Sequence, residues 1–167
     1  TKFIILGSGS SMGVPRADGF FGKCDSRNKK NYRTRCSAII KFNNQNILID
    51  TSPDLRQQLL QNKIKSINKV FFTHLHADQT HGINDLRTFF LINNKQIPIF
   101  ADKKTGKYLY KTFKYCFKSS FNYPSILKIN HLKEKHTFKN KNKKILIESF
   151  NVKHGKIDSL CYIVNNK

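Results

Sequence analysis

Short apolar runs separated by polar turns are the main pattern along this 167-residue chain. Runs of this length, bounded by Gly, Pro, Asn or Asp, are typical of strands buried in a sheet. Phe3–Leu6 and Val70–Phe72 are predicted to be buried strands of this kind. Six further segments are strand-like: Ser37–Phe42, Asn46–Asp50, Ile97–Phe100, Ile126–Ile129, Lys144–Val152 and Ser159–Val164.

The first helix is predicted to start at Ser52-Pro53. Serine is a favourable N-cap, proline suits the first helical position, and Asp54 complements the positive end of the helix dipole. Leu55 and Leu59 then supply an apolar stripe at helical spacing. We therefore expect this helix to follow directly on the strand that ends at Asp50.

Two further helices are predicted from apolar stripes, the first beginning near Asn84. Their inward positions are Leu86, Phe89 and Phe90 on one helix, and Leu109, Phe113, Cys116 and Phe117 on the other. Early hairpins followed by alternating strands and helices indicate the α/β class. The length predicts a single domain over residues 1–167.

Charge changes the picture, because 31 basic residues oppose 10 acidic ones and give a formal net charge of +21. Such a charge favours phosphate-bearing partners. However, most basic residues are lysines, and the chain is rich in Asn and Ile, residues of A/T-rich codons. Two explanations of the charge are therefore kept: codon bias alone, and codon bias combined with a preference for anionic substrates.

Cysteine usage and hydropathy bear on the compartment. The four cysteines are scattered and form no CxxC pair, so we expect reduced thiols in a cytoplasmic protein, without a disulfide framework. No apolar run reaches about 18 residues, so no membrane span is expected.

The candidate chemistry lies in "THLHADQTHGINDLR", residues 73–87. His74 and His76 are two residues apart at the end of a predicted strand, so both imidazoles can reach one ion. Asp78 follows at the same spacing, and imidazole and carboxylate are ordinary zinc ligands. Gly82 is expected to permit a tight turn into the next helix. The segment predicts a metal site.

The same segment resembles the His-x-His-x-Asp-His signature of metallo-β-lactamase-fold hydrolases. "LGSGSSMGVPR", "NYRTRCSAII", "ILIDTSPDLRQQLL" and "NVKHGKIDSLCYIV" are similar, in family order, to segments of the cyclic-phosphodiesterase-like branch. The resemblance implies an αββα sandwich, of which this chain would be the N-terminal two-thirds. Complete members hold two Zn²⁺ or Mn²⁺ ions, and we expect one here.

The resemblance also implies residue roles. His74, His76 and His154 would hold the first metal, and Asp78 would hold the second. Asp50 would orient a ligand or the metal-bound water, so Asp78 and Asp50 are the expected catalytic residues.

Four neighbouring residues complete the candidate set. By the resemblance, Asp85 and Arg87 would support the turn, with Arg87 available as an anion contact. Gln79 departs from the signature, because it stands where the family has a histidine, and an amide oxygen is a weak zinc ligand beside imidazole. His81 is the candidate substitute. The loop from Gly7 to Gly13 could offer backbone N–H groups to an anion.

The leading hypothesis is a metal-dependent hydrolase of phosphodiesters, acting on a cyclic phosphate or nucleotide and impaired by the missing C-terminal part. One alternative is a tRNA 3′-processing ribonuclease-like enzyme of the same fold. An alternative of another class is a non-catalytic remnant of a split or decayed gene. The expected partner is a phosphate-ester small molecule or a nucleic acid, and a homodimer is left open.

Overall fold

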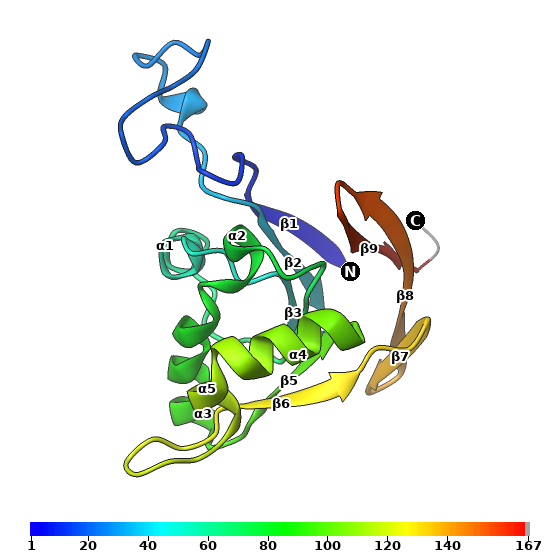
Figure 1. The fold of residues 1–167 in the computed structure, drawn as a ribbon. Coiled ribbons are helices and arrows are strands. Elements are labelled where there is room, and N and C mark those ends of the chain that lie inside the picture. The colour runs from blue at the N-terminus through cyan, green and yellow to red at the C-terminus, as the bar shows by residue number, and fades with distance from the viewer. Residues whose placement is uncertain (166–167) are drawn as a thin grey trace.

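The computed structural model describes residues 1–165, which form two β-sheets packed face to face with helices on one side (Figure 1). The first sheet has six strands in chain order: β1 (Lys2–Gly7), β2 (Ser37–Phe42), β3 (Gln45–Ile49), β4 (Lys69–Phe71), β5 (Ile97–Ala101) and β6 (Leu127–His131). The second sheet has three: β7 (Lys135–Asn140), β8 (Lys143–His154) and β9 (Ile157–Val164).

The helices lie on the face of the six-stranded sheet that points away from the three-stranded sheet (Figure 1). They are α1 (Leu55–Gln61), α2 (Ala77–Thr80), α3 (Arg87–Asn93), α4 (Lys103–Thr112) and α5 (Lys114–Phe117), with 3₁₀ turns η1 (Lys29–Asn31) and η2 (Ile83–Leu86). No helix in the described residues is long and apolar enough to cross a membrane.

Strand direction confirms the prediction of early hairpins followed by alternating strands and helices. Strands β1 to β3 pair antiparallel, whereas β3 to β6 pair parallel through helical connections. Because parallel strands end at the same edge of a sheet, the segments that follow β3, β4 and β5 are brought together there. These segments begin with Asp50, Phe72 and Asp102.

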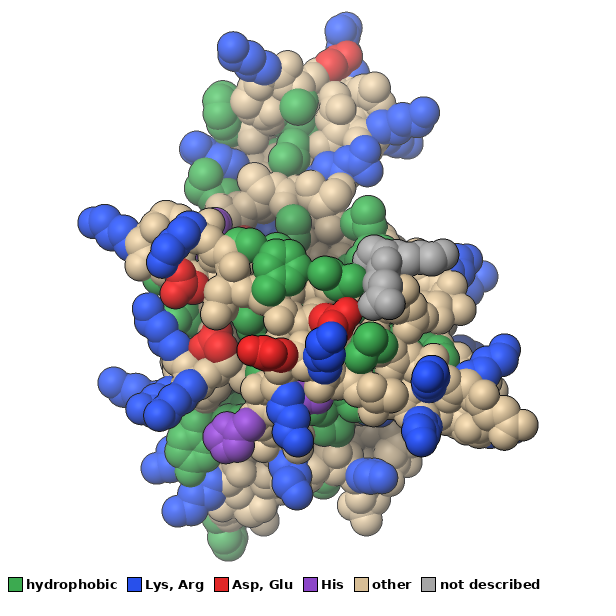
Figure 2. Space-filling view, turned by 90° about the vertical axis from the view of Figure 1, so that its right-hand side faces the viewer, with side chains coloured by type: hydrophobic (Ala, Val, Ile, Leu, Met, Phe, Trp, Pro, Cys, Tyr) green, Lys and Arg blue, Asp and Glu red, His purple; other side chains and the backbone are tan. Residues whose placement is uncertain are grey.

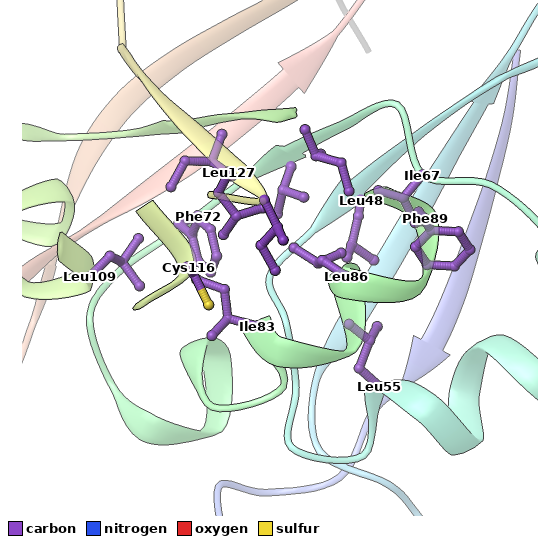
Figure 3. Close-up of a cluster of buried hydrophobic side chains, with 14 of the residues drawn as sticks. Leu48, Leu55, Ile67, Phe72, Ile83, Leu86, Phe89, Leu109, Cys116 and Leu127 are labelled. Carbon is purple, nitrogen blue, oxygen red and sulfur yellow. The ribbon is translucent and has the colours of Figure 1, made fainter. Parts of the chain in front are cut away.

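Two apolar clusters hold the layers together. The larger one joins the sheet to the helices, and Figure 3 shows Leu86, Phe89 and Leu109 directed towards sheet residues such as Leu48 and Phe72. The smaller one fills the space between the sheets, where the rings of Phe71 and Phe100 stack with centroids 4.6 Å apart. Both faces of the inner strands β2 to β5 are therefore largely buried, which explains their continuous apolar runs.

The structure corrects the predicted helices. The first helix begins at Leu55 rather than at Ser52-Pro53, although the Ser52 hydroxyl does accept a hydrogen bond from the Asp54 N–H at 3.1 Å. The stripe that ends at Phe117 belongs to two helices, because the backbone leaves helical geometry at Phe113.

Two predictions of burial were also wrong in part. The segment Phe3–Leu6 forms an edge strand rather than a buried one, and its Phe3 and Ile5 side chains are 58% and 65% exposed. The lysine-rich segment around His136 predicts a surface position for this residue, but it lies in β7, half-buried. Its ring packs edge-on against Phe100 with centroids 4.8 Å apart. Half-buried and exposed positions alternate along β7, and Lys135 and Lys139 occupy exposed positions, so no apolar run marks this strand in the sequence.

The outer face of the three-stranded sheet is covered by no helix within residues 1–165 (Figure 1). Lysine and arginine side chains are spread over this side of the molecule, with fewer acidic ones and several exposed apolar groups (Figure 2). Phe150 in β8 is 48% exposed. The described residues thus form three layers: the helices, the six-stranded sheet and the three-stranded sheet.

Candidate metal centre

Three histidines meet at the edge of the sheets where the parallel strands end. His74 and His76 follow β4, and His154 is the last residue of β8. Their possible ligand atoms all lie within 4.8 Å of one another. The Nε2 atom of His74 is 3.1 Å from the Nδ1 atom of His76. Donors at this separation can share one ion with metal–nitrogen bonds of about 2.0–2.1 Å, so the group fits a zinc-type site.

Burial keeps the central imidazole neutral. His74 is buried, whereas His76 and His154 are exposed to solvent. Burial lowers the pKa of His74 to about 4, and the neighbouring His76 and His154 add to this effect, while Asp78 and Asp102 oppose it. A neutral imidazole retains a free lone pair, which a metal ligand requires.

A short hydrogen-bond chain fixes the orientation of His74. The Thr73 hydroxyl lies 2.7 Å from Asp50 Oδ2 and donates to it, and it also lies 2.9 Å from His74 Nδ1. With its own hydrogen given to Asp50, the hydroxyl oxygen accepts from Nδ1–H of His74. In this tautomer Nε2, the atom that faces His76, carries the free lone pair.

Asp50 therefore acts on the histidine through Thr73. Its other oxygen accepts the Thr73 backbone N–H at 2.8 Å. Its own backbone has a φ of 60°, a left-handed conformation that is uncommon outside glycine. Burial raises the pKa of this carboxyl to about 7, although both Thr73 hydrogen bonds lower it.

Asp78 lies in the first turn of α2, outside the group formed by the three histidines. Its Oδ2 accepts a hydrogen bond of 2.9 Å from the side-chain amide of Gln79. Gln79 is itself buried, and its Oε1 has no hydrogen-bond partner in the described residues. The amide nitrogen thus occupies one side of the carboxylate expected to bind the second metal.

The other three candidates face elsewhere. His81 caps α2, and its ring packs edge-on against Phe113 with centroids 5.3 Å apart. Asp85 accepts the Arg56 N–H at 3.1 Å, which ties η2 to α1. The guanidinium of Arg87 lies 4.6 Å from the ring centre of Tyr123. The structure brings none of His81, Asp85 and Arg87 into the histidine group.

Glycines near the site serve close packing. The φ of Gly82 is −85°, so the expected backbone freedom is not what the turn requires. A Cβ at this position would lie only 1.9 Å from the Ser52 carbonyl oxygen. In the loop from Gly7 to Gly13, the N–H groups of Gly9 and Gly13 already donate to Thr34 and Ser10. These two amides are therefore not free for an anion.

Sequence reasoning missed two residues that contact His74. Thr73 precedes it directly, and its position between a strand and a histidine carries no signal without knowledge of Asp50. Ser159 in β9 places its hydroxyl 3.3 Å from His74 Nδ1, although 85 positions separate them in the sequence. Only the packing of the two sheets brings this hydroxyl to the site.

Two comparisons with known sequences found similarity to this chain. A family model described as a beta-lactamase superfamily domain matches residues 45–166. An octanoyltransferase from Porphyromonas gingivalis is 33% identical over 164 residues, and the match covers 96% of this chain and 32% of that protein. This chain thus spans about a third of that curated relative.

Solved structures agree in fold. A diphosphatase from the PhnP family matches with a TM-score of 0.79 and 29% identity, over 97% of this chain and 61% of that one. The short form of human tRNase Z matches with a TM-score of 0.63 and 18% identity, over 97% and 64%. Zinc-bound PqqB from Methylobacterium extorquens matches with a TM-score of 0.63 and 20% identity, over 90% of this chain and 52% of that one. The last two identities are low and show shared fold alone.

Proposed function

The chain belongs to the beta-lactamase superfamily, and on that premise we propose that it is a metal-dependent hydrolase of phosphodiesters. The observation that carries this proposal is the group of His74, His76 and His154, whose ligand atoms lie within 4.8 Å of one another. The similarity to a diphosphatase at 29% identity supports a phosphate-bearing substrate. A cyclic phosphate or a nucleotide is the expected substrate class.

The three histidines would hold one Zn²⁺ or Mn²⁺ ion. Such an ion supplies two effects when bound, a lower pKa for its water and neutralisation of charge on phosphate oxygens. The protein supplies orientation, because Asp50 and Thr73 hold His74 with Nε2 facing the group. Cationic side chains over the surface would favour approach of a phosphate ester.

We propose a single ion because Asp78 is engaged by Gln79. The carboxylate oxygen that accepts the amide is not free to bind a second cation without losing that bond. His81, the candidate substitute ligand, packs on Phe113 instead. Asp78 would then act through its remaining oxygen, as an acceptor beside the metal.

Metal binding tests the first half of the proposal. Purified chain stripped with a chelator and titrated with Zn²⁺ should bind one ion per chain by calorimetry and elemental analysis. His76→Ala should remove this binding, whereas His131→Ala should leave it unchanged, because His131 is exposed at the end of β6 and lies outside the group. Equal loss in both variants would contradict the assignment.

Hydrolysis of bis(p-nitrophenyl) phosphate with Zn²⁺ or Mn²⁺ tests the second half. We expect weak turnover that disappears in His76→Ala and persists in His131→Ala. A chain that binds one ion and shows no turnover would favour the non-catalytic alternative. Cleavage of a tRNA precursor at its 3′ end, with no activity on small diesters, would favour the ribonuclease alternative.

A further inference from the structure

Helices α4 and α5 present a continuous cationic surface. Six lysines, which we call the lysine face, are exposed along these helices: Lys103, Lys104, Lys107, Lys111, Lys114 and Lys118. No acidic residue occurs between Asp102 and Glu134. None of the ion pairs within residues 1–165 includes a member of the lysine face. The charge of this face is therefore uncompensated locally.

Lys111 in the last turn complements the dipole of α4, but the spacing of the other lysines on this helix gives it no benefit. Lys103, Lys107 and Lys111 follow one another at i, i+4, and like charges at this spacing destabilise a helix. Lys103 and Lys104 also stand in the first turn, where the helix dipole disfavours cations. The first turn contains no acidic side chain, and the Asp102 cap is already bonded to Thr105. A requirement for stability does not explain this arrangement.

Aromatic rings accompany the cations. Tyr110 and Tyr115 are 44% and 41% exposed. At about 100° per residue, Tyr110 projects from the same side of α4 as Lys103 and Lys107, about a quarter turn from the buried Leu109. Figure 1 shows α4 and α5 on the surface of the helical layer. Lysines interleaved with exposed tyrosines offer ionic contacts for phosphates and ring faces for unpaired bases.

The lysine face begins beside the candidate metal centre. Asp102, which caps α4, follows β5 at the edge where His74 follows β4, and β4 and β5 are paired neighbours. A strand of nucleic acid lying along α4 from Lys103 to Lys111 would extend about 12 Å, at about 1.5 Å per residue. One end of that strand would reach the edge of the sheet that carries the histidines.

We propose that the lysine face of α4 and α5 binds the phosphate backbone of single-stranded nucleic acid. Binding of nucleic acid by this face does not require the chain to be catalytically active. As a substrate track it rests on the proposed function, and it extends the expected substrates from an isolated nucleotide to a chain of nucleotides.

Binding is measured by the fluorescence anisotropy of a labelled single-stranded RNA of about 15 nucleotides, over a range of salt concentrations. A chelator is present throughout, so that loss of hydrolysis and loss of binding cannot be confused. The test variant is Lys107→Gln/Lys111→Gln. The matched control is Lys139→Gln/Lys141→Gln, which removes the same charge from two exposed lysines, one near the end of β7 and one in the β7–β8 turn.

Each lost phosphate contact should reduce the slope of log affinity against log salt by about 0.7, so the test variant should lose about 1.4. At about 0.1 M salt this corresponds to about 25-fold weaker binding. The control should keep the wild-type slope. Equal losses in the two double variants would overturn the proposal, because they would show that only the net charge matters.

The tyrosine contribution has its own test. Tyr110→Ala should weaken binding of single-stranded RNA without changing the salt slope, because stacking involves no counterion release. Duplex RNA should bind more weakly than the single strand. Equal affinity for duplex and single strand, with no effect of Tyr110→Ala, would refute single-strand recognition by this face.

Discussion

Thr73→Val offers a direct test of how the fold orients the central histidine. Valine has nearly the shape of threonine but no hydroxyl, so it removes the link between Asp50 Oδ2 and His74 Nδ1. The backbone N–H of Thr73 still donates to Asp50 Oδ1. The change therefore isolates one side-chain hydrogen bond within a buried chain.

Two magnitudes follow from this geometry. Asp50 is only 5% exposed, so the loss leaves one buried carboxyl oxygen without a partner, at a cost of about 1–3 kcal/mol in the free energy of unfolding. Loss of a group that orients a metal-bound histidine weakens metal affinity by about 10–100-fold. That range corresponds to about 1.4–2.8 kcal/mol of binding free energy.

Urea unfolding of the metal-free chain measures the first effect, and zinc competition against a chromophoric chelator measures the second. Thr73→Ser is the matched control, because it keeps the hydroxyl and should retain both stability and affinity. If Thr73→Val unfolds more easily but binds zinc as tightly as the wild type, the hydroxyl has a structural role only and the proposed orientation of His74 is wrong.

Two further predictions concern stability. Gly82→Ala should lower the free energy of unfolding by about 1–3 kcal/mol, because its Cβ would meet the Ser52 carbonyl oxygen, whereas Gly106→Ala, with its nearest atom at 3.8 Å, should be neutral or stabilising. Urea unfolding of both variants checks this, and equal effects would contradict it. Burial lowers the pKa of His136, the Lys133 charge adds to this, and its Nε2 accepts the Lys133 N–H at 2.9 Å. This contribution to stability should be complete above the unfolded-state pKa of about 6.5 and lost as the pH falls through the folded-state value, so the urea midpoint should depend less on acid pH in His136→Phe. An unchanged pH dependence in that variant would show that His136 does not titrate on unfolding.

Much of the fold could be predicted from local pattern. Continuous apolar runs identified most strands, because a strand buried on both faces has no polar alternation. The strand of His136 was missed for the opposite reason, since lysines on its exposed face interrupt the run. The helix boundary at Phe113 was missed as well, because the stripe from Leu109 to Phe117 keeps helical spacing across a break in the backbone.

The sequence by itself determined which residues could form the site. His74 and His76 stand at strand spacing, and similarity in segment order indicated that His154 would join them. Only the tertiary structure decided what surrounds them. Asp50 acts on His74 through Thr73, and the packing of the two sheets brings Ser159 to His74. Gln79 donates its side-chain amide to Asp78. Spacing along a chain restricts neighbours within a few residues, whereas contacts across layers depend on the register and packing of distant strands.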